Sequence, residues 1–141
     1  TLRRRDQNGR KPVVLFFCVH NAGRSQMAAA FLEQLANQRV LVASAGSDPA
    51  SQLNPAVISV MAEEGIDLTS RSPVRLDAQM VKAADVVVTM GCGDACPIYP
   101  SKRYLDWALA DPAGQDLASV RVIRDEIKSR VEALLAEITP P

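Results

Sequence analysis

A cysteine, an arginine and a serine lie close together near the start of the chain. Arg24 and Ser25 follow Cys18 in the segment Cys18-Val19-His20-Asn21-Ala22-Gly23-Arg24-Ser25. The planar guanidinium group of an arginine can hold two oxygens of arsenate or phosphate, whereas a lysine acts as a point charge. Positive surroundings favour a thiolate over a thiol, and the Ser25 hydroxyl could donate a hydrogen bond to the sulfur. The segment therefore predicts a cysteine nucleophile that attacks a bound oxyanion.

The residues on either side of this segment predict a strand before it and a helix after it. Residues 13–17 form a β-branched and aromatic run without alternation, which is typical of a strand buried on both faces of a parallel sheet. A helix is predicted from Arg24 or Ser25 to about Asn37, because apolar residues recur there at helical spacing: Met27, Phe31, Leu32 and Leu35. The N–H groups of its first turn would point toward Cys18 and form an anion cradle over residues 19–24.

The other polar residues of this loop have supporting roles in the prediction. A thiolate activated by the cradle needs no general base, so we expect His20 to make a local polar contact or to face solvent. Asn21 is predicted to brace the loop in a left-handed backbone conformation, and Gly23 to let the chain turn closely. The alternative is that Cys18 is a small buried residue that only fills the end of a strand.

A carboxylate follows the predicted fourth strand. Asp111-Pro112 comes after the stretch Tyr104–Trp107, in a loop expected on the active-site side of the sheet. A carboxyl group near a departing oxygen can act as a general acid, and Pro112 would restrict the loop that carries it. The alternative is an Asp-Pro turn without a chemical role.

Two further cysteines, Cys92 and Cys96, follow the third predicted strand, residues 86–88. They would emerge at the carboxyl ends of the strands, as Cys18 does. A second thiolate can attack the sulfur of an arseno-cysteine adduct, release arsenite and leave a disulfide, and a third thiol can pass the oxidation outward. Inert packing cysteines are one alternative. A zinc site is another, although zinc normally takes four ligands and the one histidine already lies in the loop.

Strands alternate with helices along the rest of the chain, which predicts a three-layer α/β fold with a mostly parallel sheet. We expect one domain over residues 12–141, preceded by a flexible basic tail, residues 1–11. The remaining predicted elements are a strand over 40–43, a helix capped by Asn54 with Pro55 in its first turn and a stop at Gly65, a short helix over 76–83, and a long amphipathic helix over 117–138 that ends before Pro140.

Composition narrows the possible partners. Sixteen basic residues balance sixteen acidic ones among the 141 residues, so no overall charge would draw the protein to nucleic acid or to an anionic membrane. The longest apolar stretch, residues 12–18, is far shorter than the roughly 20 residues that a membrane span needs. Because the chain also opens without a signal-peptide pattern, we expect a cytoplasmic protein whose thiols stay reduced.

These residues resemble the low-molecular-weight tyrosine phosphatase superfamily and, within it, arsenate reductases coupled to thioredoxin or to mycothiol. The resemblance runs from Val13 to about Ala136 and rests on four segments: residues 18–28, Ser44-Ala45-Gly46, the cysteine-bearing loop, and Asp111-Pro112. It implies a four-stranded parallel sheet flanked by helices. The roles that it implies are Cys18 as nucleophile, Arg24 as oxyanion clamp, Ser25 as thiolate stabiliser, Asn21 as loop brace, Asp111 as proton donor or the remnant of one, and Cys92 and Cys96 as resolving pair.

Departures from the family pattern refine this prediction. Ala113-Gly114-Gln115 follows the Asp-Pro where the phosphatases usually carry aromatic residues, which favours a reductase. The interval between Cys92 and Cys96 is shorter than is usual in thioredoxin-coupled members, so thioredoxin and mycothiol with mycoredoxin both stay open as external reductants. Ala29 replaces the helix carboxylate of the potassium site that some members build beside Asn21 and Ser44, and no bound metal ion or other cofactor is predicted.

Three functions therefore compete. The first is arsenate reduction, with phosphate or sulfate as competing oxyanions, either by the three-cysteine relay or by an external mycothiol that makes Cys92 and Cys96 dispensable. The second is phosphatase action through a phosphocysteine intermediate, with Asp111 as acid and then base. The third is an arsenite-binding module without turnover, which has no use for Arg24 or Asp111.

Overall fold

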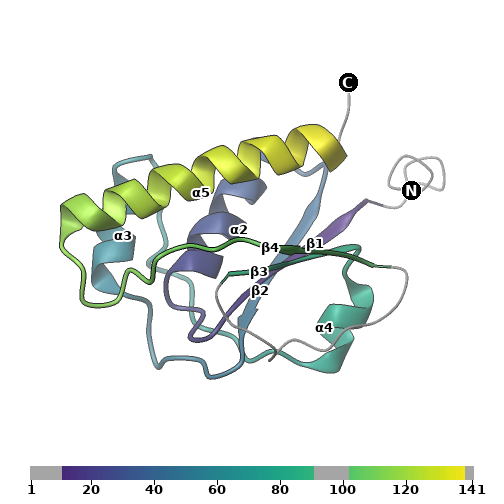
Figure 1. The fold of residues 1–141 in the computed structure, drawn as a ribbon, viewed down its shortest axis with the longest axis horizontal. Coiled ribbons are helices and arrows are strands. Elements are labelled where there is room, and N and C mark those ends of the chain that lie inside the picture. Colours follow the sequence, from purple (N-terminus) through teal and green to yellow (C-terminus); the bar gives the residue numbers. More distant parts are fainter. Residues whose placement is uncertain (1–10, 91–101, 139–141) are drawn as a thin grey trace.

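Strand β1 (Val13–Cys18) lies in the interior of a four-stranded sheet that carries the candidate nucleophile at its carboxyl end. It pairs with β2 (Leu41–Gly46) on one side and with β3 (Val86–Thr89) on the other, and β4 (Arg103–Asp106) pairs with β3. All three pairings are parallel, in the order β2-β1-β3-β4. The computed structural model describes residues 11–90 and 102–138 (Figure 1). The predicted four-stranded parallel sheet is confirmed.

Helices cover both faces of the sheet, so that β1 is buried on both sides. Alternate residues of β1 enter two different cores: Val14 and Phe16 pack into the core formed with α2 (Arg24–Ala36), α3 (Pro55–Ala62) and α5 (Leu117–Ile138). Leu15 and Phe17 enter the smaller core beneath α4 (Ala78–Ala83). Figure 1 shows α5 lying across α2 on one side of the sheet and α4 on the other. The uninterrupted apolar run in β1 is explained by this three-layer arrangement.

The beginning of α3 follows the capping residue that the sequence offers. Asn54 precedes α3, and its side-chain oxygen accepts a hydrogen bond from the backbone N–H of Ala56 with Pro55 in the first turn. The helix ends at Ala62, and the chain then turns to Gly65, whose φ of 77° a glycine adopts without strain. Helices α2 and α5 span the predicted ranges, whereas the predicted break at Pro140 lies outside the described residues.

Several elements differ from their predicted bounds: β3 extends to Thr89, and β4 covers Arg103–Asp106 where Tyr104–Trp107 was predicted. Strand β2 was predicted over 40–43 but extends to Gly46, because its last three residues pair with Phe16, Phe17 and Cys18 even though they are small or polar. Helix α4 was predicted from Leu76 but begins at Ala78, because the Asp77 side chain accepts a hydrogen bond from the N–H of Met80 and caps the helix there.

Within 11–90 and 102–138, the structure contains no helix with the length and apolar content of a membrane span.

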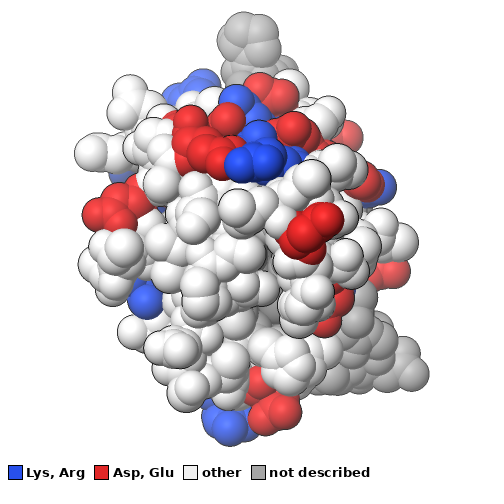
Figure 2. All heavy atoms as spheres, turned by 90° about the vertical axis from the view of Figure 1, so that its left-hand side faces the viewer, with Lys and Arg blue, Asp and Glu red and all other residues white. Residues whose placement is uncertain are grey.

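Charged side chains gather over one part of the face that carries α3 and the start of α5. Arg121 and Arg124 of α5 form ion pairs with Glu63, which follows α3. Figure 2, which views this side of the molecule, shows a dense group of charged side chains along its upper part and scattered charged groups elsewhere, with largely uncharged surface between them.

Candidate active site

Cys18 lies at the carboxyl end of β1 and is 2% exposed. The chain then forms a loop over residues 19–23 and enters α2 at Arg24. The end of β1 is held by its parallel neighbour β2, in which Gly46 is the partner of Cys18. The predicted strand-loop-helix unit is therefore present, with the thiol at its centre.

Two hydrogen bonds reach the sulfur of Cys18. The backbone N–H of Asn21 donates to Sγ over 3.3 Å, and the Ser25 hydroxyl oxygen lies 2.9 Å from Sγ. That hydroxyl also accepts a hydrogen bond of 2.7 Å from Nδ2 of Asn21, so its own proton is free to point to the sulfur. Both donors stabilise a thiolate more than a neutral thiol. The predicted contact between Ser25 and Cys18 is confirmed.

Asn21 braces the loop, as predicted. Its φ of 50° places it in the left-handed region, and its side chain is fully buried. Besides its bond to Ser25, the Asn21 side chain accepts hydrogen bonds from Nε2 of Gln26 and from the N–H of Val74. A residue in a costly backbone conformation is thus held by contacts to a helix and to a distant loop.

The first turn of α2 is left without a side-chain cap. Gly23 occupies the N-cap position and contributes no side-chain hydrogen bond, and the first turn contains no acidic residue. The leading N–H groups of a helix have no intrahelical acceptor and carry the positive end of the helix dipole. An oxyanion placed above Cys18 would meet these groups, so the geometry fits the predicted cradle.

His20 lines the cavity, and its ring contacts the backbone of the segment after β2. It is exposed, and its Nδ1 lies 2.9 Å from the carbonyl oxygen of Asp48, which can only accept a hydrogen bond. Nδ1 must then carry the proton. This agrees with the prediction of a local polar contact.

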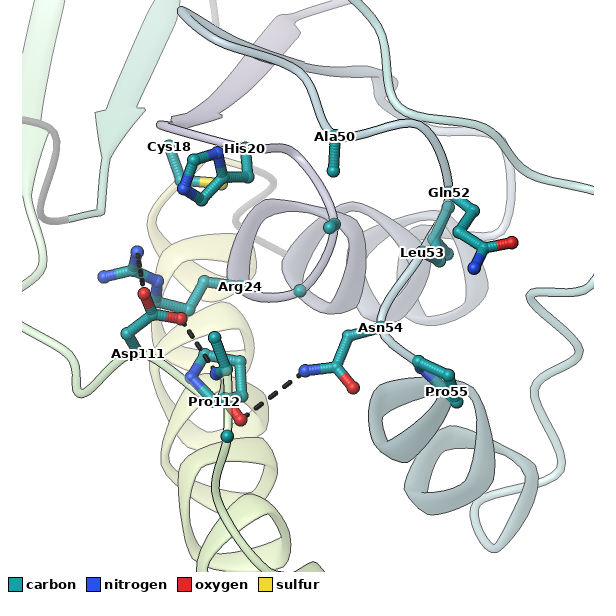
Figure 3. Close-up of a pocket in the computed structure, with 14 residues that line it drawn as sticks. Cys18, His20, Arg24, Ala50, Gln52, Leu53, Asn54, Pro55, Asp111 and Pro112 are labelled. Atoms are coloured by element: carbon teal, nitrogen blue, oxygen red, sulfur yellow. Dashed lines mark hydrogen bonds and ion pairs between the residues drawn. The ribbon is translucent and has the colours of Figure 1, made fainter.

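Arg24 and Asp111 face each other from the two sides of the site (Figure 3). Arg24 is 8% exposed, and its Nη1 donates to the carbonyl oxygen of Leu109 over 3.3 Å. Its Nη2 lies 3.9 Å from Oδ2 of Asp111, whose other oxygen accepts a hydrogen bond from the N–H of Ala113. The Asp111 side chain is 52% exposed, so a solvated carboxylate stands beside a nearly buried cation.

A cavity of about 380 Å³ opens above Cys18. The described residues that line it come from the cradle loop, from the segment before α3 and from the Asp-Pro loop (Figure 3). Among these lining residues, Arg24 is the one basic residue apart from His20, and Asp111 is the one acidic residue. The volume is within the range of small-molecule sites and far exceeds that of a single water-sized group. A small tetrahedral anion at Cys18 would leave room for a second group.

The structure thus brings together four of the predicted catalytic residues: Cys18, Arg24, Ser25 and Asp111. Cys92 and Cys96 lie outside the described residues. No role was predicted for Gln26, Leu109 or Val74. Leu109 and Val74 contact Arg24 and Asn21 from distant parts of the chain, and Gln26 contacts Asn21 from the first turns of α2. The one signal for Gln26 was its position directly after Ser25, on a helix whose neighbouring residues are apolar.

Comparison with known proteins agrees with this geometry. The family model of the low molecular weight phosphotyrosine protein phosphatases matches residues 13–140. This chain belongs to that family. The predicted resemblance, which rests on residues 18–28 and three other segments, is confirmed. The parallel sheet with flanking helices is the family's phosphatase-like fold.

Relatives named as arsenate reductases share most of the chain. The sequence is 41% identical over 130 residues to a Halobacterium salinarum protein that carries the name of an arsenate reductase, with 89% of this chain and 92% of that protein covered. It is 36% identical over 129 residues to a glutaredoxin arsenate reductase of Synechocystis, with 89% and 98% covered.

A solved structure with the same fold is the thioredoxin-dependent arsenate reductase Cg_ArsC1' of Corynebacterium glutamicum. The two share 46% sequence identity with a TM-score of 0.82, and the match covers 91% of this chain. The chain spans 62% of the length of that Corynebacterium protein.

Proposed function

We propose that this protein is an arsenate reductase in which Cys18 is the nucleophile. The observation that carries the proposal is the sulfur of Cys18, which accepts hydrogen bonds from Asn21 and Ser25 beside an uncapped helix start. Such a site favours a thiolate and a tetrahedral oxyanion at the same place. The arsenate reductase names of the relatives at 41% and 36% identity support arsenate as the substrate.

The first step forms a bond between sulfur and arsenic. Arsenate enters the cavity, and its oxygens bind the N–H groups at the start of α2 and the guanidinium group of Arg24. The Cys18 thiolate attacks arsenic, and a hydroxyl group of arsenate leaves as water after it receives a proton from Asp111 in its protonated form. Phosphate and sulfate, which have the same shape, compete for the cradle.

The second step transfers two electrons to arsenic. The Cys92 thiolate attacks the sulfur of Cys18, the electron pair of the sulfur–arsenic bond passes to arsenic, and arsenite leaves a Cys18–Cys92 disulfide. The Cys96 thiolate then attacks Cys92, which moves the disulfide to Cys92–Cys96 and frees Cys18. Both thiols follow β3, whose carboxyl end lies next to that of β1.

An external dithiol must return the two electrons. Thioredoxin is the reductant that we propose first, and the thioredoxin dependence of the Corynebacterium protein supports this choice. In the alternative, a mycothiol thiolate displaces Cys18 from arsenic, and a mycoredoxin thiolate then attacks the mycothiol sulfur, so that the electron pair of the sulfur–arsenic bond passes to arsenic, arsenite leaves and a mixed disulfide forms. Cys92 and Cys96 are then dispensable. Either cycle begins from reduced thiols, which fits a reducing compartment such as the cytoplasm.

Coupled turnover with matched cysteine variants tests the proposal. Arsenate-dependent oxidation of NADPH is measured with thioredoxin and thioredoxin reductase, for the intact chain and for Cys18→Ser, Cys92→Ser and Cys96→Ser. The relay predicts activity in the intact chain and its loss in all three variants. Activity that depends on mycothiol and mycoredoxin and survives the double Cys92→Ser/Cys96→Ser change would replace the relay by the mycothiol route. No arsenate reduction with either reductant would contradict the proposal.

One observation supports phosphatase action as a second candidate. The Asp111 carboxylate lines the same cavity as Cys18, and the cavity has room for the organic group of a phosphate ester. A phosphocysteine formed at Cys18 could be hydrolysed with Asp111 as acid and then base. Turnover of p-nitrophenyl phosphate that is lost in Asp111→Asn, together with no arsenate-dependent thiol consumption, would favour this candidate.

A further inference from the structure

Gln26 is a polar residue in a buried position directly behind the cradle. It is the third residue of α2 and is 2% exposed, and it lies among fully buried residues such as Met27 and Ala28. Burying an amide is costly unless it forms hydrogen bonds. Its Nε2 donates to Oδ1 of Asn21 over 2.9 Å and to the carbonyl oxygen of Ser72 over 3.2 Å.

Backbone groups fix the direction of every hydrogen bond between Gln26 and the thiol. The carbonyl of Ser72 can only accept, so Gln26 must present Nε2. The N–H of Val74 can only donate, so Asn21 must present Oδ1 to it, at 2.8 Å. The same Oδ1 accepts from Gln26, which leaves Nδ2 of Asn21 directed toward Ser25.

The fixed orientation of the Asn21 amide decides what the Ser25 hydroxyl does. Because Nδ2 of Asn21 donates to Oγ of Ser25, that oxygen is an acceptor in this contact and its proton is available for Sγ of Cys18. A reversed amide would present an oxygen to Ser25, and the hydroxyl proton would then have a competing acceptor. The orientation set by Gln26 and Val74 therefore favours the hydrogen bond to sulfur.

The segment that supplies the two backbone anchors is itself attached to the sheet. The N–H of Gly46 donates to the carbonyl of Val74, and the N–H of Leu76 donates to the carbonyl of Gly46. Residues 72–76 thus run beside the last residue of β2, the partner of Cys18 in β1. The anchors are held in register with the nucleophile.

We propose that Gln26 is a positioning residue that, through Asn21 and Ser25, keeps Cys18 as a hydrogen-bonded thiolate. This inference rests on the nucleophilic role of Cys18 proposed above. Gln26 is not among the residues that line the cavity, and its side-chain hydrogen bonds go to Asn21 and Ser72, so it acts through the orientation of the Asn21 amide.

Two substitutions of similar size separate this role from packing. Gln26→Met removes both hydrogen bonds and leaves the Asn21 amide without one of its orienting partners. Gln26→Glu introduces a carboxylate that can only accept, so Nδ2 of Asn21 is drawn away from Ser25 toward the new group. Gln34→Glu, at an exposed position of the same helix, is the matched control.

The readout is the rate at which iodoacetamide alkylates Cys18 in the full chain between pH 5 and 9, followed by mass spectrometry of the peptide that contains Cys18. At pH 7 we expect the rate to fall about tenfold in Gln26→Glu and less in Gln26→Met, with the pH profile displaced to higher pH, because a hydrogen bond to a charged group is lost. Gln34→Glu should match the intact chain. In a Ser25→Ala background, Gln26→Glu should add little, because both changes act on the same hydrogen bond.

A second measurement needs no variant. In the intact protein, the side-chain amide signals of Asn21 and Gln26 in ¹⁵N NMR spectra should change with pH at the same midpoint as Cys18 alkylation. Amide signals that do not change at this midpoint would overturn the inference. Unchanged alkylation profiles in folded Gln26 variants would also overturn it, as would full additivity between the Gln26→Glu and Ser25→Ala effects on the alkylation rate. Alkylation requires no turnover, so a failure of arsenate reduction is distinguished from a failure of this inference.

Discussion

Gly23 and Pro112 lie so close together that a Cβ atom on residue 23 would be 2.8 Å from Cγ of Pro112. The first belongs to the cradle loop and the second follows the candidate acid Asp111, so this contact sets the separation between nucleophile and acid. Position 23 therefore has no space for a Cβ atom, because Pro112, 89 residues further along the chain, packs against it.

Gly23→Ala should push the Asp-Pro loop away from the cradle. We expect roughly a 10²-fold loss in kcat, since a displacement of about 1 Å can have this effect on a catalytic group. The measurement is arsenate turnover with the reductant that supports the intact chain. The double change Gly23→Ala/Pro112→Ala removes the obstructing ring atom and should recover part of the activity. A double variant that is no better than Gly23→Ala would show that the contact is not the cause.

Gly46→Ala should damage the cradle from the opposite side. Its Cβ would lie 2.5 Å from the carbonyl oxygen of Val19 and 3.0 Å from the backbone nitrogen of Asn21, and backbone atoms cannot turn aside as a side chain can. We expect a free energy of unfolding lower by about 1–3 kcal/mol in urea denaturation, with slower alkylation of Cys18. Ser44→Ala, on the same strand, serves as the control. If Gly46→Ala has the same free energy of unfolding as the intact chain and its Cys18 is alkylated at the same rate, the close approach is refuted.

Arg24→Lys should lose oxyanion binding although it keeps the positive charge. A lysine cannot bind Leu109 and two anion oxygens with one planar group. We expect phosphate affinity, measured by calorimetry, to fall strongly and arsenate turnover to fall roughly 10²-fold. Arg39→Lys, at an exposed site that follows α2, should leave both unchanged. Equal affinity in Arg24→Lys and the intact chain would remove Arg24 from the anion site.

Glu63 should make the stability of the fold depend on pH. Hydrogen bonds from Arg121 and then Arg124 lower the pKa of Glu63 from 4.5 to about 2. Its folded pKa is depressed, so its contribution is fully present above about pH 4.5 and is lost as pH falls toward 2. The difference in urea midpoint between the intact chain and Glu63→Gln should therefore shrink over that interval. Glu132→Gln, at an exposed position of α5, should show no such trend.

Local signals in the sequence are sufficient to predict the elements that carry the site. The apolar run before Cys18 predicts a strand buried on both faces, and Asn54 followed by Pro55 predicts the start of α3, because capping and burial patterns act within a few residues. The carboxyl ends of parallel strands meet at one edge of a sheet, so the order of the elements also predicts that Cys18 and Asp111 lie on the same side.

Contacts between distant segments could not be predicted in this way. The hydrogen bond from Gln26 joins it to Ser72, which lies 46 positions away, and no propensity indicates such a pairing. The end of β2 at Gly46 depends on its register with β1, since the residues themselves are poor strand formers. The same limit applies to the close approach of Pro112 to Gly23, which exists only after the loops have packed.

The most direct test of arsenate reduction by the chain's own thiols is a single turnover without any external reductant. The fully reduced chain is mixed with arsenate, arsenite is quantified by chromatography, and disulfides are mapped by mass spectrometry after quenching in acid. We predict one arsenite for each protein molecule and a Cys92–Cys96 disulfide, with neither product in Cys18→Ser. Absence of arsenite from the intact chain, or arsenite formation that persists in Cys18→Ser, would contradict reduction by attack of Cys18 and relay through the chain's own thiols.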